Sequence, residues 1–254
     1  MSHIERIERE AFLHDQQALN RLKQRSTPSD LVVDADWYLD HAPWIRPAIE
    51  QLGPMAGKKL LDFGCGHGIT SVIFGQRGAT VEGFDLSPQY IEEARLRAEI
   101  NQVDARFLVA NAEDLPYADN SFDLVWGNAI LHHLDLNRAA IEIWRVLKSD
   151  GVAVFCEPWG GNPVLQFARN YLPYPGKCRT IDERPFDTAD ITHLKQLFDV
   201  QTIGFEFFGM IRRVLFREPG AGGLLSKIDR WVLRRVPYLQ QFARYTVVVL
   251  RPKR

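Results

Sequence analysis

The sequence predicts an α/β fold built on a doubly wound sheet, with helices on both faces. From residue 58 onward, short apolar runs alternate with helical patterns, which is typical of parallel strands joined by helices. The first run, Lys59–Phe63, leads into three glycines at alternate positions, and the second, Thr80–Asp85, ends in an acidic residue. The 254 residues suit one domain with additions, and a hydrophobic fraction of 46% allows a full core.

The turn after the first strand has the composition of a ligand cradle. Glycine adopts backbone conformations closed to other residues and lets a ligand approach the main chain, and here the glycines precede a helix that begins near Ile69. Their G-x-G-x-G spacing differs from the dinucleotide pattern G-x-G-x-x-G, which would require a glycine at position 69. The residues of this turn that we expect at a bound ligand are Asp62, Gly64, Cys65, Gly66 and Gly68.

The end of the second strand offers a carboxylate for a ribose. Asp85 stands 21 positions after Gly64, near the spacing at which an acid on the second strand reaches that sugar. Its carboxylate can accept hydrogen bonds from both ribose hydroxyls, and Leu86 follows it in the same turn. Ser87 and Pro88 then predict the start of a helix, so a simple capping role for Asp85 is the alternative.

Residues 62 to 68 resemble motif I of the class I S-adenosylmethionine-dependent methyltransferases. Over residues 58 to 160 the chain is similar to the type 11 methyltransferase domain of ubiquinone- and menaquinone-type enzymes. This resemblance implies a Rossmann-like sheet of about seven strands, mostly parallel, with Tyr245–Leu250 as an antiparallel last strand. It also implies S-adenosylmethionine as the cofactor, with S-adenosylhomocysteine as the product.

The resemblance further implies where the two ends of the cofactor lie. The adenine is expected beside the loop that follows the strand Ala105–Val109, although the family more often has Asp than Asn at position 111. The methionine part is expected near the end of the strand Phe122–Asn128. The residues implied in these contacts are Asn111, Ala112, Glu113 and Asn128.

Candidate catalytic residues follow the fourth and fifth strands, at the edge of the sheet where ligands bind. His132 and His133 are adjacent after the fourth strand, and either is a candidate for the base that faces the acceptor. A helix over residues 141–148, which Gly151 would terminate, leads into the fifth strand. Glu157 ends that strand as a further candidate base or substrate anchor, or as a hydrogen-bond partner within the loop.

The N-terminal residues 1–57 are expected to form a helical lid, because in the resembled family such helices lie over the cofactor. Apolar residues at helical spacing predict an amphipathic helix over residues 3–25, and a second helical stretch is expected over residues 37–52. Trp37, Tyr38 and Trp44 are candidates for the substrate side of the site, with a place in the core as the alternative.

The rest of the methyltransferase domain, residues 58–254, contains two expected insertions. Residues 158–186 are too long for an ordinary connection, which suggests acceptor recognition. A helix over residues 188–198 and a strand over residues 200–208 are expected next, followed by a basic amphipathic segment over residues 209–242. The acceptor-recognition candidates in the first insertion are Tyr171, Tyr174, Arg179 and Arg184.

Charge is distributed unevenly along the chain. Residues 211–254 carry eleven Lys and Arg against two acids, an excess of nine positive charges, whereas the whole chain has a net charge of −1. The expected helix near residues 224–235 has an apolar stripe of Leu225, Ile228, Val232 and Leu239. Either this helix docks on the domain with a solvated basic face, or it makes peripheral contact with an anionic membrane.

Composition and motifs narrow the function. Cys65, Cys156 and Cys178 are too few and too scattered for a disulfide framework or a zinc site, and no metal site is expected. No run reaches the roughly 18 apolar residues of a membrane span and no signal sequence is recognised, so a cytoplasmic protein is expected, with peripheral membrane contact as the extension. The absence of an Asn-Pro-Pro-Tyr-like motif after the fourth strand argues against a nucleic acid as the acceptor.

These features favour an S-adenosylmethionine-dependent methyltransferase that acts on a small-molecule or lipid-linked acceptor. Such a reaction requires mainly the alignment of the acceptor with the methyl group, and it requires a base only if the acceptor is protonated. A quinone-like ring, a sugar and a lipid headgroup all remain as acceptors. The alternatives are an NAD-dependent oxidoreductase, which shares the glycine turn and the ribose-binding acid, and a non-catalytic methyltransferase-like protein that only binds the cofactor.

Overall fold

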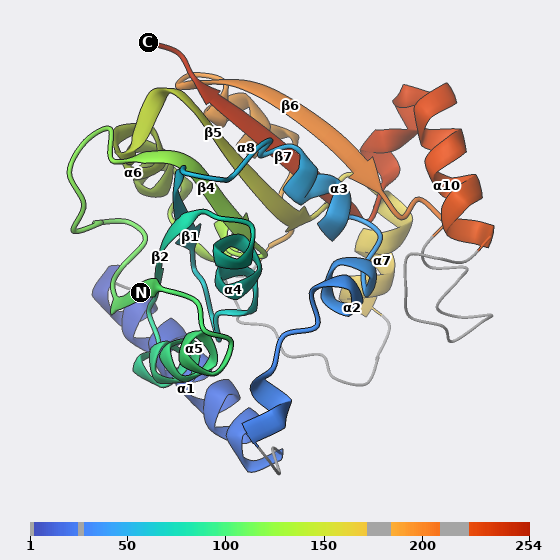
Figure 1. The fold of residues 1–254 in the computed structure, drawn as a ribbon. Helices are drawn as coiled ribbons and strands as arrows, with labels where there is room; N and C mark the ends of the chain where they lie inside the picture. Colours follow the sequence, from blue (N-terminus) through green and yellow to red (C-terminus); the bar gives the residue numbers. More distant parts are fainter. Residues whose placement is uncertain (1–2, 25–27, 172–183, 209–223) are drawn as a thin grey trace.

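The computed structural model describes residues 3–24, 28–171, 184–208 and 224–254 and contains one seven-stranded sheet (Figure 1). The strand order is β3-β2-β1-β4-β5-β7-β6. Strand β7 runs antiparallel to β5 and β6, and the other pairs are parallel, which confirms the expected fold class. The strands are β1 (Lys59–Phe63), β2 (Thr80–Asp85), β3 (Ala105–Val109), β4 (Phe122–Asn128), β5 (Leu147–Pro158), β6 (Phe198–Phe205) and β7 (Tyr245–Pro252).

Helices cover both faces of this sheet (Figure 1). One buried cluster joins the sheet to α6 and α8, and a second joins its other face to α2, α3 and α4. The order of the strands reverses between β1 and β4, and ligands of such sheets bind at the carboxyl ends of the strands at this point. The helices are α1 (His3–Gln24), α2 (Ala35–Asp40), α3 (Ile45–Glu50), α4 (Ile69–Gln76), α5 (Pro88–Ile100), α6 (Leu136–Val146), α7 (Pro163–Tyr171), α8 (Thr188–Leu194) and α10 (Leu224–Arg235), with short 3₁₀ turns η1 (Pro28–Leu31), η2 (Leu131–His133) and η3 (Pro237–Phe242).

Strand β1 shows how the sequence pattern sets the two faces. Leu61 and Phe63 pack in one core, and Leu60 packs in the other, because successive side chains of a strand point to opposite faces. The glycine turn then delivers the chain into α4 through Gly68, which has φ +78. A Cβ atom there would lie 2.8 Å from the Cβ of Ala94 on α5, so this glycine allows α4 and α5 to pack closely.

Several element boundaries differ from those expected. The single helix expected over residues 37–52 is the pair α2 and α3, interrupted around Pro43, which lacks a backbone N–H and disfavours a helical residue before it. The helix expected over residues 141–148 begins already at Leu136, where Asp135 caps it, and it ends at Val146, before Gly151. Helix α8 stops at Leu194, and β6 therefore begins earlier than expected.

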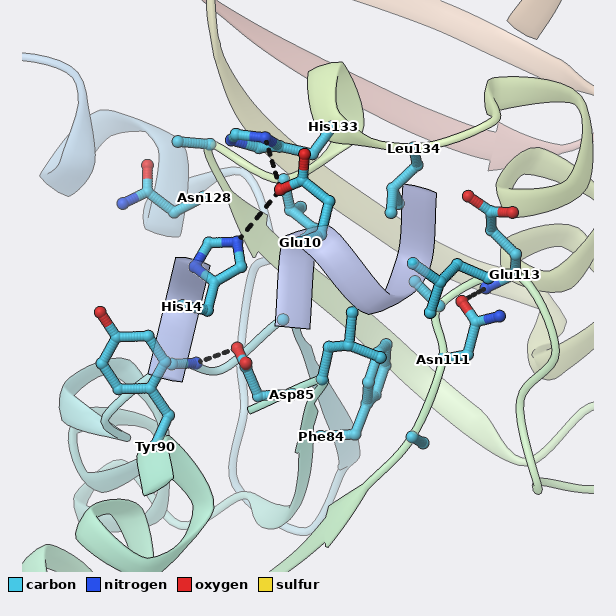
Figure 2. Close-up of a pocket in the computed structure, with 18 of the residues that line it drawn as sticks. Glu10, His14, Phe84, Asp85, Tyr90, Asn111, Glu113, Asn128, His133 and Leu134 are labelled. Carbon is cyan, nitrogen blue, oxygen red and sulfur yellow. Dashed lines mark hydrogen bonds and ion pairs between the residues drawn. The ribbon is translucent and has the colours of Figure 1, made fainter. Parts of the chain in front are cut away.

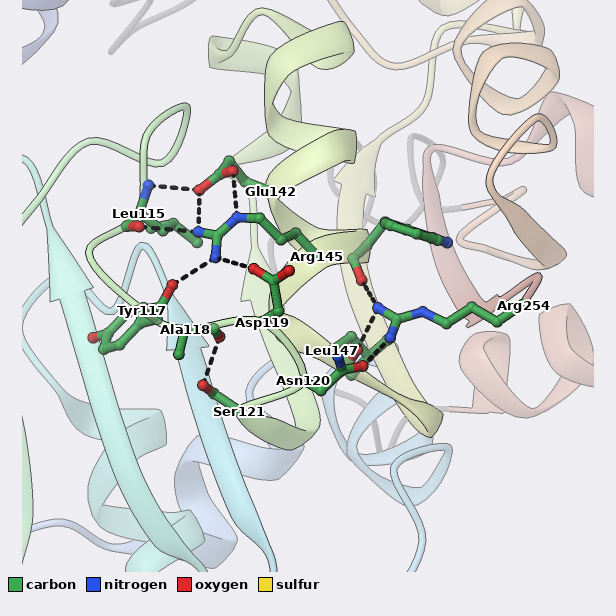
Figure 3. Close-up of polar contacts among 11 residues, drawn as sticks. Leu115, Tyr117, Ala118, Asp119, Asn120, Ser121, Glu142, Arg145, Leu147 and Arg254 are labelled. Carbon is green, nitrogen blue, oxygen red and sulfur yellow. Dashed lines mark hydrogen bonds and ion pairs between the residues drawn. The ribbon is translucent and has the colours of Figure 1, made fainter.

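The loop between β3 and β4 is held in place by α6 (Figure 3). The guanidinium of Arg145 donates to the backbone oxygens of Leu115 and Tyr117 at 3.0 and 2.6 Å. It also pairs with Glu142 at 2.7 Å, which lowers the pKa of that carboxyl group, and Glu142 accepts the Leu115 N–H at 2.7 Å. This network fixes the loop whose first residues, 111–113, lie at the carboxyl edge of the sheet.

Helix α10 docks on the domain through one buried face. Ser226, Asp229 and Leu233 are buried, whereas Ile228 is 40% exposed and Trp231 is 61% exposed. The carboxylate of Asp229 accepts the backbone N–H groups of residues 207 and 208, at 3.3 and 2.8 Å, and these bonds set the rotation of the helix. Of the apolar stripe, Ile228 is therefore exposed, whereas Leu225 and Val232 are half-buried. None of the described helices is long and apolar enough to cross a bilayer.

The basic residues near the C-terminus do not form one surface. Those of α10 lie on one side of the molecule, and the end of β7 lies far from them (Figure 1). At that end, Arg254 donates to the backbone oxygen of Leu147 at 2.8 Å and contacts Asn120 and the backbone oxygen of Trp144 (Figure 3). Arg244 pairs with Glu206 at 2.8 Å. Part of the positive charge therefore serves the fold.

Candidate functional site

The carboxyl ends of β1, β2 and β4 open into a cavity of about 250 Å³, which we call cavity A (Figure 2). Helix α1 forms the opposite wall of cavity A. Asp85, Tyr90 and His14 lie toward one end, and Asn111 and Glu113 lie toward the other (Figure 2). The expected site residues that line cavity A are Gly64, Gly66, Asp85, Leu86, Asn111, Ala112, Glu113, Asn128 and His133.

A second cavity of about 150 Å³, cavity B, lies against the same glycine turn. Gly64, Gly66 and Asn128 line both cavities, so A and B meet at this turn. Helix α2 and the start of α4 contribute further walls. Three residues that the sequence suggested for the site line cavity B but not cavity A: Tyr38, Asp62 and Cys65.

The glycines of the turn have different physical roles. Gly64 and Gly66 have φ values of +71 and +51, in the left-handed region. A Cβ atom at Gly64 would lie 2.8 Å from the side chain of Ile130, whereas a Cβ atom at Gly66 would meet nothing within 4 Å. The main chain at Gly66 is therefore open to the cavities. Gly68, also expected at the ligand, lines neither cavity and serves the packing of α4 on α5.

Asp62 connects the strand β1 with the first turn of α4. Its Oδ2 atom accepts the hydroxyl groups of Thr70 and Ser71 at 2.8 and 2.6 Å. Burial raises the pKa of Asp62 to about 6. Cys65, next to it along the turn, is also buried, and burial raises the pKa of its thiol, which disfavours the thiolate needed for nucleophilic chemistry.

Asp85 holds the glycine turn and still faces cavity A. One carboxylate oxygen accepts the backbone N–H of Gly66 at 2.9 Å, and the other accepts that of Ser87 at 3.0 Å. Burial raises the pKa of Asp85, and these N–H groups together with the nearby His14 oppose that rise. An ionised carboxylate has about four acceptor positions, so two remain for hydroxyl groups of a ligand.

The loop after β3 uses its polar side chains partly for its own shape. The Oδ1 atom of Asn111 accepts the Glu113 N–H at 3.0 Å, which fixes the orientation of the amide. Glu113 is buried, accepts the backbone N–H of Asp135 at 2.8 Å and forms an ion pair with Arg6 of α1. Its carboxylate therefore joins the loop to α1 and α6, in addition to lining the cavity.

A carboxylate and an imidazole meet below the turn that follows β4. Glu157 is fully buried, and its Oε1 accepts the N–H groups of Ile130 and Leu131 at 3.1 and 2.9 Å. Its Oε2 lies 2.6 Å from Nδ1 of His132. These bonds hold a strained turn, since Ala129 adopts φ +57, a conformation uncommon outside glycine. Donation from Nδ1 leaves Nε2 of His132 as the proton-accepting nitrogen.

His132 and His133 also line a third cavity of about 250 Å³, cavity C, whereas Glu157 lies behind them. His133 lies between cavities A and C, and its Nδ1 is 3.6 Å from Glu10 of α1. Arg184, one of the acceptor-recognition candidates, lines cavity C and pairs with Asp187 at 3.0 Å and with Asp190.

The remaining aromatic and acceptor candidates are dispersed. Trp37 and Tyr171 are 67% and 72% exposed, and neither lines cavities A, B or C. Trp44 stacks on Tyr245 of β7, with ring centroids 3.8 Å apart, and belongs to the packing of the sheet. Two candidates lie outside the described residues, and they are Tyr174 and Arg179.

The polar face of α1 is a part of the site that was not predicted from the sequence. Arg6, Glu10 and His14 recur every four residues, so they share one side of the helix, and this side faces cavity A. The expected stripe contained apolar residues only, and one of them, Leu19, is 37% exposed. The i, i+4 spacing of these polar side chains is the signal that could have revealed them. Within the described ranges, no group of three or more His, Cys, Asp or Glu could hold a metal ion.

Comparison with known proteins places this site in a family. The type 11 family described as "Methyltransferase domain" matches residues 61–155. A demethylmenaquinone methyltransferase of Tropheryma whipplei (strain Twist) is 31% identical over 193 residues, which cover 73% of this chain and 78% of that protein. The chain belongs to this family. It is a class I S-adenosylmethionine-dependent methyltransferase.

Two further relatives of this methyltransferase have informative names. A ubiquinone biosynthesis O-methyltransferase of Cereibacter sphaeroides (strain ATCC 17025 / ATH 2.4.3) is 34% identical over 110 residues, 43% of this chain and 44% of that one. The crystal structure of a geranyl diphosphate C-methyltransferase from Streptomyces coelicolor A3(2), in complex with Mg²⁺, geranyl diphosphate and S-adenosylhomocysteine, has a TM-score of 0.58. It is 18% identical and covers 82% of this chain and 76% of its own, which supports the fold.

The family assignment settles the reaction class. The methyltransferase takes its methyl group from S-adenosylmethionine and transfers it to a small-molecule acceptor. The expected cofactor is thus confirmed, and the alternatives of an NAD-dependent oxidoreductase and of a non-catalytic protein are set aside.

Proposed function

We propose that cavities A and B hold S-adenosylmethionine on the two sides of the glycine turn. The ribose lies at Asp85, the adenine lies beside Asn111 and Ala112, and the methionine part enters cavity B past Asn128. Three features support this placement. Cavities A and B meet at Gly66, whose main chain is open, Asp85 retains acceptor capacity for two hydroxyl groups, and the loop at residues 111–113 borders the far end of cavity A.

The acceptor enters through cavity C and carries a hydroxyl group, with His132 as the base that removes its proton. The observation that carries this proposal is the buried contact of 2.6 Å between Glu157 and His132 Nδ1, because it orients the imidazole of a residue that lines cavity C. The cofactor supplies a methyl group on a positively charged sulfur. His132 accepts the hydroxyl proton at Nε2, and Glu157 stabilises the resulting imidazolium.

The names of two relatives suggest the acceptor class. One is a demethylmenaquinone methyltransferase and the other acts in ubiquinone biosynthesis, so a hydroxylated quinone-like ring is the acceptor that we propose to test first. The probes are 1,4-naphthohydroquinone, catechol and methyl glucoside, each with S-adenosylmethionine that carries a labelled methyl group. Label in a phenol but not in the sugar is the expected result, and label in none of the three contradicts the proposed class.

The role of His132 is tested with the acceptor found in that screen. Replacing His132 with Gln should lower kcat by about a hundredfold or more and leave the affinity for S-adenosylhomocysteine unchanged. Glu157→Gln should lower kcat less, since it leaves the imidazole in place. The matched control is His193→Gln, on α8 and outside cavities A, B and C. Equal loss in the control, or no loss in His132→Gln, would contradict the assignment of the base.

Helix α1 is the lid of this site, whereas α2 and α3 support the sheet. The proposal rests on the contacts that α1 makes around cavity A. Arg6 pairs with Glu113 and donates to the His133 backbone oxygen at 2.8 Å, and Asp15 accepts the hydroxyl of Ser87 at the start of α5. By contrast, α2 and α3 contribute buried side chains to the core of the sheet. Cofactor exchange requires the contacts of α1 to open.

We further propose that α10 rests on an anionic membrane and that this membrane carries a lipid-linked acceptor. Ile228, Trp231 and Tyr238 are exposed on or beside this helix, together with the basic Arg234 and Arg235. Exposed apolar and basic side chains on one helix suit a charged lipid surface.

Co-sedimentation with vesicles of phosphatidylglycerol and phosphatidylcholine tests the membrane contact. We expect binding at low salt that falls with added salt and that is weakened by Trp231→Ala. The matched control is Trp37→Ala, which removes an equally exposed Trp from α2. Absence of binding by the wild type, or an equal loss in the control, would refute the role of α10.

A further inference from the structure

Trp126 has a polar atom for which the described part of the chain provides no hydrogen-bond partner. It lies on β4, in register with Asp62 of the adjacent β1, and its side chain is fully buried. Its indole Nε1 is buried without a hydrogen-bond partner among the described residues. A buried N–H group without an acceptor costs free energy comparable to a lost hydrogen bond, so such groups are rare in native proteins.

The side chain of Trp126 is one wall of cavity B. Its neighbour across that cavity, Tyr38 of α2, has its hydroxyl within hydrogen-bonding reach of Asn128, and burial raises the pKa of that hydroxyl, which keeps its proton available. Ile69 and Thr70 also line cavity B. They begin α4, a helix of eight residues, and its first backbone N–H groups favour an anion.

Cavity B therefore combines two kinds of group. The indole of Trp126, the hydroxyl of Tyr38 and the start of α4 can donate hydrogen bonds to an anion. Asp62 is an acceptor with negative charge above its pKa of about 6. A ligand that matches both kinds must carry an anionic and a cationic group on neighbouring atoms, which describes an amino acid. The carboxylate has to lie on the donor side, because Asp62 repels it and attracts the ammonium group.

We infer that Trp126 Nε1 and the Tyr38 hydroxyl bind the carboxylate of the cofactor's methionine part, while Asp62 faces its ammonium group. This inference rests on the proposed placement of the cofactor in cavities A and B and assigns two residues that the sequence motif does not contain. Both act by positioning: they fix one end of the cofactor in cavity B, and the sulfur is thereby held at the turn between the two cavities.

The test compares two ligands that differ in the carboxylate alone. S-adenosylmethionine has it, and decarboxylated S-adenosylmethionine lacks it but keeps the sulfonium, the ammonium and the adenosine. Calorimetric titration of the wild type should give a weaker affinity for the decarboxylated form by about tenfold or more, since hydrogen bonds to a charged group are lost. Trp126→Phe should weaken the affinity for S-adenosylmethionine by about ten- to a hundredfold and change the affinity for the decarboxylated form by no more than about threefold.

Trp144→Phe is the matched control, because Trp144 also has a buried Nε1 without a partner among the described residues and lines none of the three cavities. It should leave both affinities unchanged. If Trp126→Phe fails to fold, which thermal unfolding shows, Tyr38→Phe carries the test, because it removes one hydroxyl and should give the same selective loss.

The outcomes distinguish a wrong role for Trp126 from a wrong placement of the cofactor in cavities A and B. Equal affinity of the wild type for the two ligands, or an equal effect of Trp126→Phe on both, or no effect on either, would overturn the role of Trp126. In each of these cases S-adenosylmethionine still binds, and the effect of Asp85→Ala on that binding tests the cofactor placement separately. Failure of the wild type to bind either ligand would instead refute the placement itself, and the inference with it.

Discussion

Removal of the Asp85 carboxylate is the sharpest test of the cofactor placement. In the structure, each oxygen of this carboxylate accepts one backbone N–H, from Gly66 at 2.9 Å and from Ser87 at 3.0 Å. Asp85 lines cavity A, and the acceptor capacity that these bonds leave is available for the two ribose hydroxyls. Asp85→Ala removes both bonds to the ribose, and Asp85→Asn replaces one oxygen with a donor and removes the charge.

The magnitude follows from the number of bonds. A hydrogen bond to a charged group contributes about 1.5–3 kcal/mol, so two of them contribute about 3–6 kcal/mol if they add. Two bonds to one carboxylate are not independent, and water enters the space that the alanine leaves, so the lower end applies. A loss of about 3 kcal/mol corresponds to a dissociation constant roughly 150 times larger. Asp85→Asn should lose about half of that free energy, or roughly tenfold in affinity.

Calorimetric titration with S-adenosylhomocysteine measures this loss directly, without an acceptor. Asp104→Ala is the control, because Asp104 is an exposed acid that lines none of the three cavities. Thermal unfolding must accompany the titration, since the N–H groups of Gly66 and Ser87 lose their acceptor in Asp85→Ala. An affinity of Asp85→Ala within threefold of the wild type, in a folded protein, would refute the assignment of the ribose to this carboxylate.

Three further predictions concern the surroundings of the cavities. Since the pKa of Asp62 is raised from 3.8 to about 6 in the folded protein, its contribution to stability is greatest below about pH 4 and is lost as the pH rises to 6, by about 3 kcal/mol. The unfolding free energy of the wild type should therefore fall relative to that of Asp62→Asn, by about 3 kcal/mol between pH 4 and 6, and parallel curves would contradict the raised pKa. Arg6→Gln should speed the release of S-adenosylhomocysteine by about tenfold in stopped-flow measurements, because the ion pair with Glu113 is lost. For the same reason it should increase hydrogen exchange of the backbone amides in α1. Unchanged amide exchange would exclude α1 as the lid. Gly64→Ala should lower the free energy of unfolding in chemical denaturation by about 1–2 kcal/mol more than Gly66→Ala does. Both glycines have positive φ, but only a Cβ atom at Gly64 would clash, with the side chain of Ile130. Equal losses would show that this side chain moves away without cost.

Much of the sheet could be predicted from the sequence, because local signals and tertiary packing agree there. The bounds of the first four strands match the predictions, since each apolar run is closed by glycine, proline or a polar turn. The helix expected over residues 37–52 was predicted less well. Pro43 divides this expected helix into α2 and α3. The apolar stripe of α10 did not show which side docks, and the bonds of Asp229 leave Ile228 exposed. A hydrophobic pattern shows that one side of a helix is apolar, but the packing of the helix on the rest of the protein determines which side is buried.

The candidate site also contains residues that could be predicted from the sequence and residues that could not. Asp85 and the glycine turn could be predicted, because a short local pattern determines both their conformation and their place at the edge of the sheet. The pairing of His132 with Glu157 could not, since it depends on the approach of two strands across 25 residues of sequence. The i, i+4 spacing of Arg6 and His14 shows that they share one side of α1, but it does not show which cavity that side covers.

The lid that we propose, α1, borders both halves of the proposed site. Arg6 and Glu10 of α1, together with His133, line both cavity A and cavity C. Arg6 bonds both to Glu113 in the loop beside the proposed adenine and to the backbone of His133, so a displacement of α1 that opens cavity A also removes part of the wall of cavity C. Under the proposed placement of the acceptor, a complete cavity C is present only when α1 is closed over cavity A. A cofactor that favours the closed position of α1 would therefore raise the affinity for the acceptor by the same factor by which the acceptor raises the affinity for the cofactor.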